Sequence, residues 1–148
     1  MPQIIEEPIH HRILIKASRE VVYELLTTAE GWDSFFTVGT ELELVPGGTM
    51  ILRWVDWGPD KLTVQARCDI IRFAPPEQFV FQWFPVDETH PTTVEFNLYK
   101  SGDDTILDLK EYGYPDSSEG RKRMLDCATG WGEATALMKF FLEHKVRY

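Results

Sequence analysis

Hydrophobic residues near the end of the chain recur at steps of three and four, which is the spacing of one face of an α-helix. The stripe begins at Met124 and runs through Trp131 to Leu142, while most charged residues fall on the other side. Asp116, with a Glu three residues later, has the spacing of a capping box and predicts a helix over 116–148. At 1.5 Å per residue, about 30 residues form a rod of about 45 Å, too long for a short strand pair to cover. The pattern therefore predicts a long C-terminal helix on a large curved sheet.

The segments before this helix mostly alternate apolar and polar residues, the period of a strand with one buried face. Ile9 to Ala17 is the first of them. Two short helical patterns follow, one capped by Ser18 and the other, over 28–36, carrying Trp32. Turn residues bound six further strand patterns, over 41–45, 49–57, 62–73, 78–84, 92–100 and 105–112. This order predicts an α+β fold with an antiparallel sheet of about seven strands.

The chain has 148 residues and a formal net charge of −9, from 15 basic and 24 acidic side chains. This excess of acid argues against general affinity for nucleic acid or an anionic membrane, because both need clustered Lys and Arg. The two cysteines, Cys68 and Cys127, are too few for a disulfide scaffold, and we expect free thiols in a reducing cytosol. The acidic start, 1–11, is unlike a signal peptide, and no segment is apolar enough to span a membrane. We therefore expect one cytoplasmic domain over 1–148.

Five Trp, nine Phe and five Tyr are more than the core of a small domain usually needs, and they suggest a lined cavity. A long helix cannot touch a curved sheet everywhere, so space opens between them. Gly130 and Gly132, on either side of Trp131, indicate either a bend in the helix or room for a close neighbour. The alternative is that the same residues pack a solid core. Alternation and helix spacing predict this lining: His11, Trp32, Phe36, Trp54, Cys68, Phe81, Trp83, Phe96, Glu111, Trp131, Ala134 and Met138.

Glu111 is the one carboxylate that alternation directs inward, beside Leu107 and Leu109. Burial would raise the pKa of its carboxyl group, and such a group can serve as a general acid or as an anchor for a ligand. The other interpretation is that the end of the strand is solvated and Glu111 is in water. His11, on the same face, is expected to be a hydrogen-bonded core histidine rather than a base.

Motifs for other chemistry are missing from the sequence. His10 and His11 are adjacent strand residues that point to opposite faces, so they cannot chelate a metal together. Cys68 and Cys127 sit in apolar patterns, which favours inert packing over nucleophilic catalysis. There is no glycine-rich phosphate loop and no serine-hydrolase motif. We expect no metal, no cofactor and no catalytic residue.

The order of elements resembles the helix-grip fold of Bet v 1-like and START-like proteins, the SRPBCC superfamily. More narrowly, it resembles the activator-of-Hsp90-ATPase-homologue-like family. Two motifs depart from the family pattern: Ser18 replaces the usual Pro after the first strand, and Trp32 follows Glu30 sooner than usual. The segments that carry the resemblance are Ile15-Lys16-Ala17-Ser18, Leu26-Thr27 through Trp32, Pro46-Gly47-Gly48 with Met50, Pro75-Pro76 leading to Phe79-Val80-Phe81-Gln82-Trp83, and Gly130-Trp131.

The resemblance implies a curved sheet that grips the C-terminal helix, with a cavity between them and no common catalytic motif. It supports the binding of a small hydrophobic or aromatic ligand in that cavity, and we expect a binding protein rather than an enzyme. Two alternatives stay open. One is a protein-interaction module like the Hsp90 co-chaperones, with a partner protein or a second copy of the chain; the other is an enzyme like the polyketide cyclases and aromatases.

Overall fold

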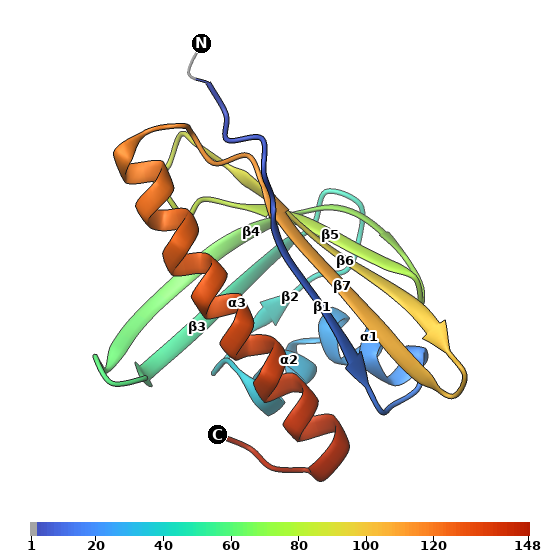
Figure 1. Ribbon diagram of the computed structural model, residues 1–148. Coiled ribbons are helices and arrows are strands. Elements are labelled where there is room, and N and C mark those ends of the chain that lie inside the picture. Colours follow the sequence, from blue (N-terminus) through green and yellow to red (C-terminus); the bar gives the residue numbers. More distant parts are fainter. Residues whose placement is uncertain (1–2) are drawn as a thin grey trace.

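The computed structural model describes residues 3–148 and shows one antiparallel seven-stranded sheet crossed by a long helix (Figure 1). The strand order is β1-β7-β6-β5-β4-β3-β2, so β1 and β2 form the edges. The strands are β1 (Ile9–Ile15), β2 (Glu41–Leu42), β3 (Thr49–Trp57), β4 (Leu62–Ala74), β5 (Gln78–Trp83), β6 (Thr92–Ser101) and β7 (Asp104–Tyr112). The helices are α1 (Arg19–Thr27), α2 (Ala29–Phe35) and α3 (Ser118–His144). The predicted α+β helix-grip fold is confirmed.

The long helix α3 begins two residues later than the capping-box pattern predicts. Ser117 is the N-cap, because its side chain accepts the N–H of Gly120 at 3.0 Å, whereas Asp116 pairs with Arg121 at 2.7 Å. The helix then continues without a break to His144. Its buried face consists of the apolar stripe read from the sequence, including Trp131, Ala134, Met138 and Leu142.

The two short helices pack against each other through a glycine. Ser18 and Thr28 cap α1 and α2, each accepting a main-chain N–H from three residues further on. A Cβ on Gly31 would lie 2.1 Å from the carbonyl oxygen of Leu25, so only glycine allows this approach. The indole of Trp32 then donates to the Leu26 carbonyl at 2.7 Å.

Alternate residues of the central strands cover one face of the sheet and form the core with α3. Neighbouring strands place Met50 opposite Cys68, Phe81 opposite Val94, and Phe96 opposite Leu109. These side chains are fully buried, as the alternation predicts. The second strand is shorter than the predicted 41–45, because Val45 and Gly48 donate within the tight turn, to Glu43 and Val45, rather than to β3.

The sheet is open on one side of β4, and this opening positions the candidate site. Asp69 to Ala74 pair with β5, but the preceding half of β4, from Leu62 to Cys68, pairs only with β3 among the described strands. Because β5 ends at Trp83, the loop that follows it borders the unpaired half of β4. Within 3–148, no helix is long and apolar enough to cross a membrane.

Candidate functional site

The Glu111 carboxylate lies completely buried between the sheet and α3. Trp131 of α3 donates its indole N–H to one carboxylate oxygen, Oε1, at 2.9 Å. The other oxygen, Oε2, accepts the indole N–H of Trp83 at 2.7 Å and the hydroxyl of Thr92 at 2.5 Å. Of the two interpretations of Glu111 from the sequence, the buried one is confirmed.

Burial raises the pKa of Glu111, and the donors around it offset part of this effect. An indole N–H can only donate, so the two tryptophans favour the ionised carboxylate. Tyr114 lies beside Glu111 and Cys127, and its buried hydroxyl has no hydrogen bond of normal geometry within residues 3–148. Burial also raises the pKa of the Cys127 thiol to about 12 and that of Cys68. Both thiols are therefore protonated at neutral pH.

Aromatic rings form a continuous cluster from Glu111 toward α2. The rings of Trp83 and Trp131 lie 5.5 Å apart, centroid to centroid, and Phe81 meets Trp83 edge-on at 6.0 Å. Phe96 contacts Trp131 at 5.8 Å and Trp32 at 6.1 Å. Aromatic pairs at such distances stabilise a core beyond the area they bury.

Most of the predicted lining residues lie together, and His11 lies apart from them. Nearly all of them belong to one hydrophobic core between the sheet and the helices. His11 lies apart on β1, where its Nε2 donates to the Ala128 carbonyl at 3.0 Å, as expected for a hydrogen-bonded core histidine. Gly132 leaves room for this imidazole, since a Cβ there would lie 3.4 Å from its Cε1. Trp32, Trp54, Cys68, Phe81, Phe96, Glu111, Trp131, Ala134 and Met138 are buried, whereas His11, Phe36 and Trp83 are half-buried.

A pocket of about 620 Å³ lies at the opening of the sheet. The unpaired half of β4 contributes Gln65, Ala66 and Arg67; the other wall is Trp83, Phe84, Pro85 and Glu88. Trp83 belongs to the predicted lining, Ala66 lies on the strand face that alternation directs inward, and Trp83 joins this pocket to Glu111. No sequence pattern indicates the loop residues, because the opening depends on the unequal lengths of β4 and β5.

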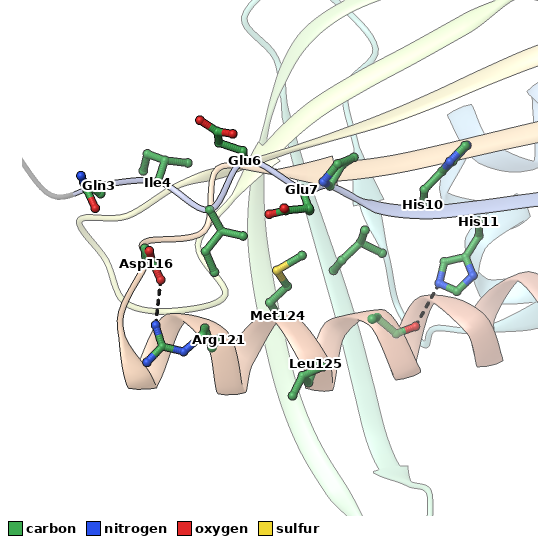
Figure 2. A pocket seen from close by; sticks show the side chains of 14 residues that line it. Gln3, Ile4, Glu6, Glu7, His10, His11, Asp116, Arg121, Met124 and Leu125 are labelled. Atoms are coloured by element: carbon green, nitrogen blue, oxygen red, sulfur yellow. Dashed lines mark hydrogen bonds and ion pairs between the residues drawn. The ribbon is translucent and has the colours of Figure 1, made fainter.

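A larger groove, about 940 Å³ in volume, lies between the N-terminal segment and the first half of α3 (Figure 2). His11 alone among the predicted lining residues borders it. Figure 2 shows Met124 extending from α3 toward the N-terminal segment, and Glu7 extending from that segment toward α3. No motif marks this groove, because the residues before Ile9 lie outside any strand pattern.

The histidines and acids are not gathered into a metal site within residues 3–148. His10 contacts Asp108 at 3.0 Å on one face of β1, while His11 faces α3. His90 contacts Asp87, in the loop after β5, at 2.8 Å.

Comparison with solved structures shows the same fold in several bacterial proteins. The Aha1 dimer from Colwellia psychrerythraea is 23% identical, with a TM-score of 0.76, over 93% of this chain and 97% of that one. CalU16 from Micromonospora echinospora is 21% identical, with a TM-score of 0.71, over 90% and 73%. A protein from Bordetella parapertussis is 24% identical, with a TM-score of 0.73, over 96% and 78%. At these identities the likeness shows the fold alone.

The comparison with curated proteins gives no match. The family model described as activator of Hsp90 ATPase homolog 1-like protein matches residues 16–143, which run from the end of β1 almost to the end of α3. This span includes every strand after β1, the aromatic cluster and Glu111 with its donors. The chain therefore belongs to the activator of Hsp90 ATPase homolog 1-like family.

Proposed function

We propose that this protein binds a small apolar or aromatic molecule that carries an N–H or O–H donor. The ligand enters at the opening beside β4, and its donor group binds Glu111 between the sheet and α3. The observation that carries the proposal is the link between the pocket and Glu111: Trp83 lines the pocket and donates to the carboxylate at 2.7 Å.

Burying a carboxylate costs stability unless hydrogen-bond donors surround it. A carboxylate at a buried position therefore supports a role in binding rather than in packing. Glu111 lies at the end of a strand whose other inward residues, Leu107 and Leu109, are apolar and fully buried. Its donors come from three separate elements, β5, β6 and α3. If a ligand displaces Trp83, Oε2 of Glu111 can accept a hydrogen bond from the donor group of that ligand.

Trp83 is the residue that a ligand would move. It is half-buried, while Trp131 beneath it is 4% exposed. A rotated Trp83 side chain would uncover both Oε2 of Glu111 and the face of the Trp131 ring. The space released joins a pocket of about 620 Å³, within the usual range for small-molecule sites.

The pocket and core favour binding over catalysis. Burial raises the pKa of both thiols, which disfavours the thiolate that a nucleophilic cysteine needs. The remaining pocket groups, such as Gln65, Arg67 and Glu88, are exposed. We therefore propose a carrier or sensor of a small molecule.

The test uses N-phenyl-1-naphthylamine, a neutral fluorescent molecule with one N–H donor, and its N-methyl analogue, which lacks the donor. We expect the first to bind with a Kd of about 1 µM, roughly −8 kcal/mol, and to quench tryptophan emission. The analogue should bind about tenfold more weakly, because it displaces the Trp83 donor from Oε2 of Glu111 without supplying a hydrogen bond in its place.

Ala66→Phe should abolish probe binding by filling the opening, since Ala66 is half-buried on its wall. Val55→Phe is the matched control, because Val55 is exposed on β3 outside this pocket. Equal binding of both probes, or unchanged binding by a folded Ala66→Phe variant, would contradict the proposed site.

A further inference from the structure

The free edge of β1 is covered along only part of its length. In the part of the chain that the structure describes, this strand pairs with β7 on one side and has no strand on the other. Near its end, Lys139 of α3 donates to the carbonyl of Leu14 at 2.7 Å. The N–H of Lys16 donates to Glu143 at 2.8 Å. Two side chains of α3 therefore occupy the main-chain groups that a further strand would use there.

The first half of the same edge lacks such cover. Residues of an antiparallel strand alternate in the side toward which they direct their N–H and C=O groups. Because the main chain of Leu14 faces the free edge, the main-chain groups of His10 and Arg12 face it too. Within residues 3–148, no side-chain hydrogen bond involves the main chain of either residue. An unpaired strand edge of this kind can accept another strand.

The large groove of about 940 Å³ lies directly beside this uncovered edge (Figure 2). Its apolar lining includes Ile4 and Leu125, which are 49% and 71% exposed, and the half-buried Met124. In peptide recognition by strand addition, main-chain hydrogen bonds provide affinity and a neighbouring groove holds alternate side chains. Here the edge of β1 provides the main-chain groups, and the groove provides the space for side chains.

The charges around the groove select the kind of peptide. Arg121 is paired with Asp116 at 2.7 Å, and Asp108 pairs with both Arg12 at 3.1 Å and His10 at 3.0 Å. Glu6 and Glu7 also line the groove, are exposed, and form no ion pair with any described residue. The unbalanced charge of the groove is therefore negative, in a chain whose net charge is −9. Such a surface favours Lys or Arg on its partner.

We propose that an extended segment of a partner protein, with apolar residues alternating with basic ones, binds in this groove as an additional strand beside His10 and Arg12. Its apolar side chains contact Met124 and the other apolar lining residues of α3, and its basic side chains lie near Glu6 and Glu7. This site is separate from the proposed small-molecule site beside Trp83, and neither depends on the other.

The test uses a fluorescein-labelled peptide in which valine alternates with lysine and threonine, titrated into the full chain by fluorescence anisotropy. A peptide with glutamate in place of lysine should bind at least about tenfold more weakly. N-methylation of alternate residues should abolish binding when it blocks the N–H groups that face β1. N-methylation of the other alternate set should leave binding unchanged, because those groups face solvent.

Variants of the protein locate the site. Met124→Gln should weaken binding of the lysine peptide about tenfold, while Met124→Leu should preserve it. Leu62→Gln is the control outside the groove, since Leu62 is an exposed residue of β4. The pair Glu6→Gln and Glu7→Gln should weaken binding and reduce its salt dependence. The pair Glu24→Gln and Glu30→Gln, exposed on the short helices, should do neither.

Several results would overturn the proposal. They are failure of the lysine peptide to bind, equal binding of the two N-methylated peptides, or binding insensitive to Met124→Gln. A dimer of the free chain that dissociates in Met124→Gln would show that a second copy occupies the groove instead. Loss of N-phenyl-1-naphthylamine binding in Met124→Gln, without any peptide binding, would assign the groove to a small molecule.

Discussion

Trp83 and Trp131 direct their indole N–H groups to opposite oxygens of one carboxylate, with ring centroids 5.5 Å apart. The first residue ends β5, the second lies in the middle of α3, and the carboxylate belongs to Glu111 of β7. One buried carboxyl group thus connects the sheet to the helix that covers it. The same arrangement leaves Trp83 half-exposed and Trp131 buried, so the two donors differ in how readily they can be displaced.

Replacing Glu111 by Gln should destabilise the protein by about 1–3 kcal/mol at pH 5, because the side-chain NH2 group would face an indole donor or leave one unpaired. The difference in the free energy of unfolding between the Gln variant and the natural chain should become smaller as the pH rises. Burial raises the folded-state pKa of Glu111 above its unfolded value of about 4.3, so between the two values the native state binds more protons. The free energy of unfolding of the natural chain then falls with rising pH in this window, and the Gln variant lacks this contribution.

Urea unfolding of both proteins between pH 4 and pH 8 measures this difference. Thr92→Val is a useful companion, because it removes one donor to Glu111 but keeps the carboxyl group, so the pH-dependent loss should become larger. A deficit of Glu111→Gln that does not change with pH would show that the carboxyl group has the same pKa in the folded and unfolded states.

Trp131 should contribute to stability through both its ring and its N–H group. Trp131→Ala should cost about 3–5 kcal/mol, as for other buried aromatic truncations, because the side chain is 4% exposed. Trp131→Phe keeps an aromatic ring but leaves Oε1 of Glu111 without its donor, and should cost about 1.5–3 kcal/mol. Denaturant titration gives both values. A loss below about 1 kcal/mol for Trp131→Ala would mean that α3 is not held to the sheet at this residue.

The faces of the strands could be predicted from the sequence because alternation has a period of two residues. That period places Phe81, Phe96 and Glu111 on the inner face, and all three are fully buried. The long stripe on α3 likewise predicted that Trp131 and Met138 are buried, as found. These features depend on local spacing alone.

The contacts between elements could not be predicted in the same way. Trp83 and Trp131 reach Glu111 from positions 28 and 20 residues away, and only the register of the strands and the rotation of α3 bring them together. The opening beside Ala66 arises because β5 ends while β4 continues. Glu6 and Glu7 belong to no strand or helix, so no periodicity connected them to the groove.

Asp33 should stabilise the turn after α2 in a pH-dependent way. Its carboxylate accepts the hydroxyl of Thr37 at 2.8 Å and the N–H groups of Gly39 and Thr40, each at 3.0 Å. Burial alone would raise the pKa of Asp33, but the hydrogen bonds from Thr40, Thr37 and Gly39 together lower it. The stabilisation is therefore fully present above the unfolded value of about 3.9, and is lost as the pH falls through the folded-state pKa.

Asp33→Asn should accordingly cost about 1–3 kcal/mol at pH 7 and much less near pH 2. The comparison is made by chemical denaturation, with Asp60→Asn as the control, because Asp60 is exposed in the turn between β3 and β4. A cost that stays the same at both pH values would show that the neutral side chain holds the turn equally well.

Two glycine-to-alanine substitutions should change stability in opposite directions. Apart from the neighbouring backbone of α3 itself, no described atom lies within 4 Å of the position that a Cβ would take on Gly130, which is inside this helix. Gly130→Ala should therefore raise the free energy of unfolding by about 0.5–1 kcal/mol, through better helix propensity and a less flexible unfolded chain. A Cβ on Gly31 would lie 2.1 Å from the Leu25 carbonyl oxygen, so Gly31→Ala should lower it by at least about 1–3 kcal/mol.

Urea midpoints of the two variants, at an unchanged slope, give these values directly. The pair is matched in chemistry, since each substitution adds one methyl group to a helical glycine. A Gly130→Ala variant less stable than the natural chain would mean that another group fills the space beside α3. A Gly31→Ala variant of unchanged stability would mean that α1 and α2 can separate without cost, and that their close packing does not hold Trp32 in place.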